Sequence, residues 1–192
     1  LDKLSNRINY ANLAIDELGS VYESLLDYEP KLATAAKTLG NRSVNRGQFY
    51  LDDRGTDRKT TGSYYTDSRL VAQLIESALV PVMNNALVGK ATTEEKEAAL
   101  LDLKVADIAC GSGAFLCAAL EKMGEQLAIL RMGEEERPTE DQLREAKRDV
   151  LLHCIYGVDL NPMALELAMF SLWITASLPD MPLTFLDHKL KC

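Results

Sequence analysis

Two acidic residues and two glycines form the pattern in this sequence that could most plainly bind a ligand. Asp107 lies at the end of a short apolar run, and Gly111 and Gly113 follow it closely. Glycines there permit a tight turn and let a ligand approach the backbone, while the amide groups of a following helix can receive polar ligand atoms. Asp159 ends the next apolar run, where a carboxylate suits the two hydroxyl donors of a ribose. These residue types indicate a nucleoside site.

The residues around the turn favour an amino-acid nucleoside over a dinucleotide. The dinucleotide fingerprint places a glycine or alanine three residues after Gly113, where this chain has Leu116. Asp107 would repel a pyrophosphate, but it could neutralise the ammonium group of an amino acid. Asp159 lies farther from the glycines than the usual spacing of about 20 residues, and an extra helix between them explains the excess. A turn with a purely structural role remains the alternative.

Strand and helix patterns alternate from Thr66 onward, as in a parallel doubly wound sheet of the α/β class. Three helices begin with recognisable caps, namely capping boxes at Thr92 and Thr139 and an Asn161 cap. Thr66 is expected to cap the first helix, which should end before Pro81. The expected strands are 104–108, 154–158 and 183–186, and the expected helices are 66–80, 92–101, 114–133, 139–152 and 162–177.

The first third of the chain differs from this core. Apolar residues recur at steps of three and four over residues 2–27, which predicts an amphipathic helix. Glycine turn signals and a strand candidate at 48–51 then indicate a hairpin or an irregular arm. We therefore expect three parts: an N-terminal helical segment at 1–40, a hairpin or irregular arm at 41–65, and the core at 66–192.

The formal net charge of −8 argues against a chain that binds nucleic acid strongly by itself, because proteins that bind the phosphate backbone usually present a basic surface. One stretch of the acidic chain is rich in basic residues. Its five basic and three acidic side chains give it a net charge of +5 − 3 = +2. A solvated loop is the preferred interpretation of this stretch, with a nucleic-acid contact as the alternative. Its members are Arg42, Arg46, Arg54, Arg58 and Lys59, against Asp52, Asp53 and Asp57.

The four cysteines lack the spacing of a metal site, so we expect reduced, mostly buried thiols and no bound metal. No apolar run is expected to approach the ~18 residues that would span a membrane, and no signal peptide opens the chain. The sequence therefore predicts a cytoplasmic protein without a membrane segment. Its first residue is Leu1 rather than Met, which favours a piece of a longer protein.

Four stretches of the sequence carry a family resemblance. Residues 107–116 are Asp-Ile-Ala-Cys-Gly-Ser-Gly-Ala-Phe-Leu, and residues 155–164 are Ile-Tyr-Gly-Val-Asp-Leu-Asn-Pro-Met-Ala. These two resemble the first and second motifs of the adenine-specific DNA methyltransferases. Residues 61–66, Thr-Gly-Ser-Tyr-Tyr-Thr, and the helical stretch at 18–26 resemble the type IIG restriction–modification branch of that family.

The resemblance implies an incomplete Rossmann-like sheet, S-adenosylmethionine as the cofactor and double-stranded DNA as the partner. It implies that Thr66 contacts the methionine end of the cofactor and that Asp159 binds the ribose hydroxyls. It further implies that Leu160 packs against the adenine. The residues that would hold the methionine amino-acid group are Asp107 and the backbone of Ala109, Cys110, Gly111 and Gly113.

Of three departures from the family pattern, two matter little and the third decides what the chain can do. Ile108 and Asp67 replace two prolines, and the family's catalytic Asn/Asp-Pro-Pro-Tyr/Phe motif, which holds a flipped-out adenine, does not occur. We therefore expect the cofactor-binding portion of an adenine-amino DNA methyltransferase from a restriction–modification or phage-defence system, without a catalytic residue. The alternatives are a portion of an RNA or protein-amide methyltransferase and a non-catalytic interaction module, and a nicotinamide oxidoreductase ranks last.

Overall fold

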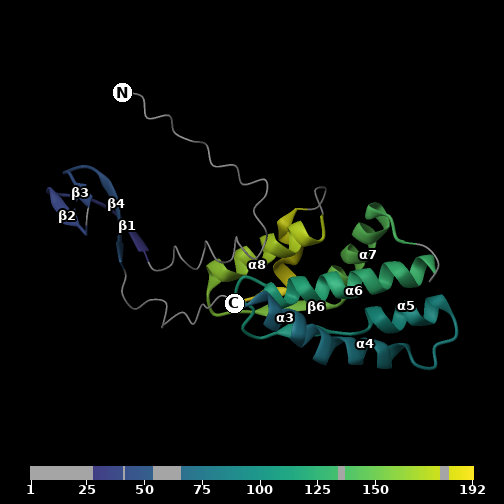
Figure 1. Cartoon of the computed structure of the whole chain (residues 1–192). Helices are drawn as coiled ribbons and strands as arrows, with labels where there is room; N and C mark the ends of the chain where they lie inside the picture. Colours follow the sequence, from purple (N-terminus) through teal and green to yellow (C-terminus); the bar gives the residue numbers. More distant parts are fainter. Residues whose placement is uncertain (1–27, 41, 54–65, 134–136, 178–181) are drawn as a thin grey trace. The chain divides into compact units, whose positions relative to one another are not determined.

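The computed structural model describes residues 28–40, 42–53, 66–133, 137–177 and 182–192. The chain divides into two compact units, Leu1–Tyr65 and Thr66–Cys192, and Figure 1 draws both. The division coincides with the residue at which the sequence analysis begins the core.

The described part of the first unit consists of two antiparallel strand pairs. β1 (Tyr28–Leu32) pairs with β4 (Phe49–Asp53), and β2 (Lys37–Leu39) pairs with β3 (Arg42–Val44). The strand expected at 48–51 corresponds to β4. The helical segment expected for 1–40 is wrong over residues 28–40, because β1 and β2 occupy them. Pro30 fits into β1 because each strand of a two-stranded pair has a free edge. Residues 1–27 and 54–65 lie outside the described residues.

The second unit contains a three-stranded parallel sheet, which fits the α/β class. β5 (Val105–Asp107), β6 (Ile155–Val158) and β7 (Leu190–Lys191) lie in the order β5-β6-β7. The first two strands lie where the sequence predicts them, whereas the third prediction, 183–186, is wrong. Those residues belong to η2 (Leu183–His188), a 3-10 helix. Short apolar runs do not distinguish strand from helix, and this one bonds locally, with the Phe185 N–H donating to the Pro182 carbonyl at 3.2 Å.

Four helices of this unit begin where the sequence indicates. α5 (Thr93–Leu101), α6 (Ala114–Met132), α7 (Glu140–His153) and α8 (Pro162–Thr175) follow Thr92, Gly113, Thr139 and Asn161. Thr92 and Thr139 form the expected capping boxes, and the Asn161 side chain accepts a hydrogen bond from the Met163 N–H. Gly133 caps the end of α6, as expected.

The helix after Thr66 differs from its prediction at both ends. Asp67, not Thr66, is the cap, because its side chain accepts a hydrogen bond from the Arg69 N–H at 2.9 Å. The helix also continues past Pro81, as α3 (Ser68–Leu74), a π-helical turn η1 (Ile75–Leu79) and α4 (Val80–Leu87). Proline lacks an N–H and crowds the carbonyl four residues before it, and the wider π turn ahead of Pro81 relieves that crowding.

The combined run Ser68–Leu87 is more apolar than the sequence analysis expects. An 18-residue window of this 20-residue run has a mean hydropathy of 1.3, and 11% of the window is buried. By length and composition alone the run could cross a membrane, so the expectation that no apolar run is long enough is wrong.

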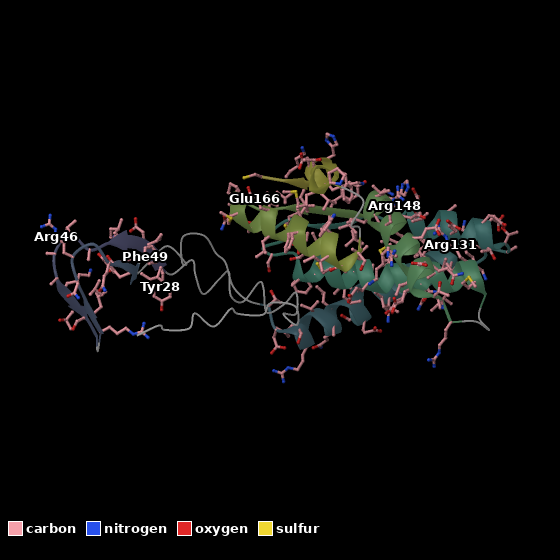
Figure 2. All side chains as sticks on the ribbon, turned by 90° about the horizontal axis from the view of Figure 1, so that it is seen from above. Tyr28, Arg46, Phe49, Arg131, Arg148 and Glu166 are labelled. Carbon is pink, nitrogen blue, oxygen red and sulfur yellow. The ribbon has the colours of Figure 1, made fainter. Side chains whose placement is uncertain are left out.

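α6 is the centre of the core. It packs against α3, α5, α7 and α8 and against the strands β5 and β6, and its inward side chains are fully buried. Near its end, Arg131 forms ion pairs with Glu97 of α5 and Asp149 of α7, and Figure 2 shows Arg131 among the side chains of this region. The first residue of α6 follows the glycine turn directly, so the core fixes the position of that turn.

Candidate nucleoside-binding site

The carboxyl ends of β5 and β6 carry the two acidic residues predicted for the site. β5 ends at Asp107, and β6 ends at Val158, directly before Asp159. The strands are parallel, with Asp107 opposite Gly157, so both carboxylates lie at the edge of the sheet where α/β proteins bind ligands. Asp107 and Asp159 are both half-buried.

Asp159 joins the glycine turn to the start of α8. Its Oδ2 accepts a hydrogen bond from the Gly111 N–H at 2.8 Å, and its Oδ1 accepts one from the Asn161 N–H, also at 2.8 Å. Gly111 and Asp159 are 48 residues apart in the sequence. Each carboxylate oxygen keeps a second lone pair, so the group can still accept hydrogen bonds from a ligand. The sequence indicates Asn161 only as a helix cap and gives no signal for its bond to Asp159.

Glycine is needed at positions 111 and 113 for different structural reasons. Both have positive φ angles, +52° at Gly111 and +88° at Gly113. A Cβ at Gly113 would lie 3.2 Å from the Cβ of Ala168 on α8, whereas a Cβ at Gly111 would meet nothing within 4 Å. Gly113 therefore permits close packing of α6 on α8, and the backbone at Gly111 is open to a ligand.

The residues between Asp107 and the glycines form a turn that lies close to two negatively charged carboxylates. The Ala109 N–H donates to Asp107 Oδ1 at 3.1 Å, and the Cys110 N–H donates to the Val158 carbonyl at 3.0 Å. Burial, and then the negative charges of Asp107 and Asp159, raise the pKa of the Cys110 thiol to about 12. Because both carboxylates act on the same small region, the turn favours a positively charged ligand group.

The remaining two predicted residues are placed less directly. Leu160 follows Asp159 and is 94% exposed, so its side chain is available for an apolar contact. Thr66 is half-buried and lies just before α3. Among the described hydrogen bonds, none joins Thr66 to Asp107 or Asp159, and its role toward a cofactor stays a prediction.

The comparison with protein families decides the class of this chain. Residues 84–188, more than half of the chain, match the profile of the MmeI DNA-methyltransferase domain. The chain belongs to this family. The β5–turn–α6 segment and the β6–Asp159–α8 segment both lie inside the matched range of this methyltransferase domain.

Two relatives agree with the family match. The chain is 27% identical over 171 residues to the type II restriction enzyme and methyltransferase RM.Eco57I of Escherichia coli, an alignment that covers 85% of this chain and 15% of that protein. It is 26% identical over 161 residues to the adenine-specific methyltransferase PglX of Streptomyces coelicolor, with 84% and 11% covered. The chain thus spans less than a sixth of the length of either relative. These matches confirm the predicted resemblance to adenine-specific DNA methyltransferases.

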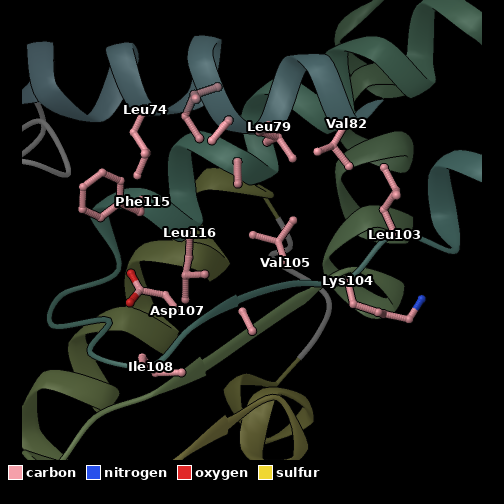
Figure 3. Close-up of a pocket in the computed structure, with 14 residues that line it drawn as sticks. Leu74, Leu79, Val82, Leu103, Lys104, Val105, Asp107, Ile108, Phe115 and Leu116 are labelled. Atoms are coloured by element: carbon pink, nitrogen blue, oxygen red, sulfur yellow. The ribbon is translucent and has the colours of Figure 1, made fainter. Parts of the chain in front are cut away.

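A cavity of about 490 Å³ adjoins Asp107 in this methyltransferase domain, and Figure 3 shows the residues around it. Apart from Lys104 and Asp107 its lining is apolar, and it comes from α3, η1 and α4 on one side and from β5 and α6 on the other. The sequence carries no signal for this cavity. Within the described ranges, no group of three or more His, Cys, Asp or Glu side chains is placed to hold a metal ion.

Proposed function

We propose that this chain is the S-adenosylmethionine-binding portion of a site-specific adenine-amino DNA methyltransferase, of the type IIG branch, in a restriction–modification or phage-defence system. The observation that supports this most is the Asp159 carboxylate, which Gly111 and Asn161 hold at the end of β6. The relatives' names support the reaction class. In this proposal the β5-β6-β7 sheet is an incomplete Rossmann-like doubly wound sheet.

The residues present fit a cofactor that is cationic at its amino-acid end and carries a ribose. Two carboxylates at one turn favour ammonium and sulfonium groups and disfavour a pyrophosphate. The free lone pairs of Asp159 suit two ribose hydroxyls, and the exposed Leu160 suits the face of an adenine. The methionine end would be held by Thr66, Asp107 and the backbone of Ala109, Cys110, Gly111 and Gly113.

Bound S-adenosylmethionine supplies a methyl group on a sulfonium, which is open to attack by an amino nitrogen. This chain's part in the reaction is to bind and orient that donor, because the core fixes the glycine turn and Asp159 fixes the ribose. No Asn-Pro-Pro or Asp-Pro-Pro occurs in the 192 residues. In this proposal the group that holds the flipped-out adenine and most contacts with double-stranded DNA lie elsewhere in a longer, cytoplasmic enzyme. The net charge of −8 agrees with that division.

Calorimetric titration with S-adenosylmethionine, and separately with NAD, tests the cofactor. We expect S-adenosylmethionine to bind, NAD not to bind, and Asp159→Ala to abolish binding. Asp187→Ala is the matched control, because it removes an exposed carboxylate from η2 and should bind like the unchanged chain. The cofactor assignment is wrong if S-adenosylmethionine binds neither this chain nor a longer polypeptide with a completed sheet.

A methyl-transfer assay on the longer polypeptide tests the acceptor. Labelled S-adenosylmethionine is offered with double-stranded DNA, with RNA and with protein, and N6-methyladenine in the DNA is the expected product. Label in RNA or protein, with none in DNA, would replace the proposed substrate by one of the alternatives.

A further inference from the structure

The first unit carries a positively charged ribbon within an acidic chain. β2, β3 and the turn 45–48 that leads to β4 contain Lys37, Arg42 and Arg46 and no acidic residue, which gives a charge of +3. The net charge of the chain is −8, so its other residues together carry −8 − 3 = −11. We call residues 37–48 the basic ribbon. Two of its cations belong to the basic stretch of the sequence, whose other cations lie outside the described residues.

The strand pairing places two of these cations on one face. Lys37 lies opposite Val44, and Arg42 lies opposite Leu39. Opposed residues of an antiparallel pair share a face, and successive residues alternate between faces, so Lys37 and Arg42 share one face. The Lys37 Nζ lies 3.8 Å from the centroid of the Tyr50 ring. A cation over an aromatic ring keeps its charge, so this lysine is positioned without being neutralised.

The third cation lies on a hydrogen-bonded turn. The Gln48 N–H donates to the Asn45 carbonyl at 3.0 Å, and the Asn45 N–H donates to Gln48 Oε1 at 2.8 Å. The Gly47 N–H donates to the Ala33 carbonyl at 2.7 Å. Arg46 is exposed within this turn, and Figure 2 shows its side chain directed away from the strands. The turn therefore presents a guanidinium group on a backbone that hydrogen bonds hold in place.

Within the described residues, no acidic side chain forms an ion pair with the basic ribbon. Glu29 and Asp52, on β1 and β4, both form ion pairs with Lys31 at 3.0 Å. Arg42 and Arg46 are both exposed. Salt screens charges that are more than about 10 Å away, so a local group of cations can bind an anion although the whole chain is acidic. This arrangement favours a nucleic-acid contact over a solvated loop.

We propose that the basic ribbon binds the phosphate backbone of the double-stranded DNA substrate. The inference rests on the proposed function, in which the longer enzyme methylates DNA. Guanidinium groups bind phosphate oxygens through two parallel hydrogen bonds, and the major groove of DNA admits a two-stranded β-ribbon. Contacts to phosphates position a protein on the duplex without reading its sequence. The basic ribbon therefore raises the affinity for all duplexes alike, and the choice of target sequence belongs to other parts of the polypeptide.

Salt-dependent binding of the full-length polypeptide to a labelled DNA duplex, measured by fluorescence anisotropy, tests this contact. Each phosphate contact contributes about 0.9 to the slope of log K against log salt concentration. Arg42→Gln/Arg46→Gln should therefore make the slope shallower by about 1.8. At about 0.1 M salt the variant should bind duplexes of every sequence about tenfold more weakly. A slope equal to that of the unchanged polypeptide would overturn the proposal.

Two control variants separate a local contact from the net charge. Arg144 and Arg148 are exposed on α7, so Arg144→Gln/Arg148→Gln removes the same charge from the second unit and should keep the slope. Equal losses in the two glutamine variants would refute the ribbon contact. Arg42→Lys/Arg46→Lys retains both charges and should also keep the slope, and a slope as shallow as that of Arg42→Gln/Arg46→Gln would contradict a phosphate contact. All three variants should keep the Tm, because the replaced side chains are exposed.

Other anionic partners have their own signatures. If Arg42→Gln/Arg46→Gln weakens binding to duplex RNA and leaves binding to DNA unchanged, the basic ribbon is an RNA contact. If it weakens binding to polyglutamate alone, the partner is an acidic protein. Either result overturns the proposal.

The methyl-transfer assay distinguishes this inference from the proposed function. Arg42→Gln/Arg46→Gln should raise the KM for DNA and leave kcat and the affinity for S-adenosylmethionine unchanged. An unchanged KM, with methylation of DNA intact, refutes the ribbon contact alone. Weaker duplex binding by the variant, in a polypeptide that binds no S-adenosylmethionine, refutes the cofactor assignment and leaves the ribbon contact intact.

Discussion

Replacing Asp159 by asparagine should loosen the glycine turn even without a ligand. Both carboxylate oxygens accept a backbone hydrogen bond at 2.8 Å, from Gly111 and from Asn161. An asparagine side chain offers one acceptor, so its amino group would face the second N–H and leave that donor unsatisfied. A hydrogen bond to a charged group contributes about 1.5–3 kcal/mol, and we expect about 1–2 kcal/mol here because water reaches this half-buried position.

Urea unfolding of the 192-residue chain, followed by circular dichroism, measures this loss. With a slope of about 2 kcal/mol/M, the middle of the usual range for urea, the midpoint should fall by roughly 0.5–1 M. Asp107→Asn is the matched control, because an amide oxygen can keep the one described hydrogen bond that Asp107 accepts, from Ala109. Its unfolding free energy should change by less than about 0.5 kcal/mol. Equal losses in the two variants, or no loss at Asp159, would refute the bridging role, whatever the cofactor.

Four further measurements test the core and the thiols. Gly124→Ala in α6 should lower the unfolding free energy by about 1 kcal/mol. The added Cβ would lie 2.6 Å from Cγ and 3.2 Å from Cα of Lys147. This crowding outweighs the higher helix propensity of alanine, which is itself worth about 1 kcal/mol. At the exposed neighbour, Glu125→Ala should change stability little, and a stabilised Gly124→Ala would contradict the close helix packing. Arg131→Met should lower the unfolding free energy by about 1 kcal/mol equally at pH 6 and pH 9, because hydrogen bonds to its carboxylate partners raise the pKa of the guanidinium and keep it charged; a loss that changes between these pH values would contradict this. Iodoacetamide at pH 8 should label Cys192 and spare three buried thiols in the folded chain, which mass spectrometry checks. Burial raises the pKa of these thiols in the folded chain, to about 12 for Cys110 and Cys117 and to about 11 for Cys154. Above a pH of about 9 the thiols therefore lose their protons in the unfolded chain before they do so in the folded chain. The unfolding free energy should fall as the pH rises through this range.

The sequence predicts well those features that depend on neighbouring residues. Thr92 and Thr139 cap their helices through residues three positions away, and Gly133 ends α6. The capping bonds close within one helical turn, so no tertiary contact is needed to anticipate them. The same holds for the glycine turn, where the residue type at Gly113 permits the positive φ that the turn requires.

The sequence does not reveal the strand at Leu190 or the helix that continues through Pro81. Leu190 becomes a strand residue because it pairs with Gly157, far away in the sequence, whereas the more apolar run before it forms η2. Pro81 remains inside a helix because a π turn precedes it, and nothing in the local pattern announces that turn. The strand prediction at 183–186 is wrong because that run closes its hydrogen bonds locally, and the helix end predicted before Pro81 is wrong because a π turn accommodates the proline.

Some features of the candidate site can be predicted from the sequence, whereas others depend on contacts between distant residues. The sequence places Asp107 and Asp159 at strand ends, because an acidic residue after an apolar run is visible without a structure. It cannot show that Asp159 also bonds the Gly111 N–H, since this contact joins residues 48 positions apart. Nor can it show that Asp107 borders a cavity, because the opposite wall comes from α3 and α4.

Asp107 lies between a completed side of the sheet and an open one. Toward β6 its strand is paired, and the turn that follows is held by Asp159 through Gly111. On the other side, β5 has no strand partner among the described residues, and Asp107 lines the cavity there. A fourth strand there would remove water from the Asp107 side, and a carboxylate attracts a nearby cation more strongly in a drier environment. Under the proposed function, completing the sheet would therefore strengthen the hold on the methionine ammonium, so fold completion and donor binding would be coupled through this one carboxylate.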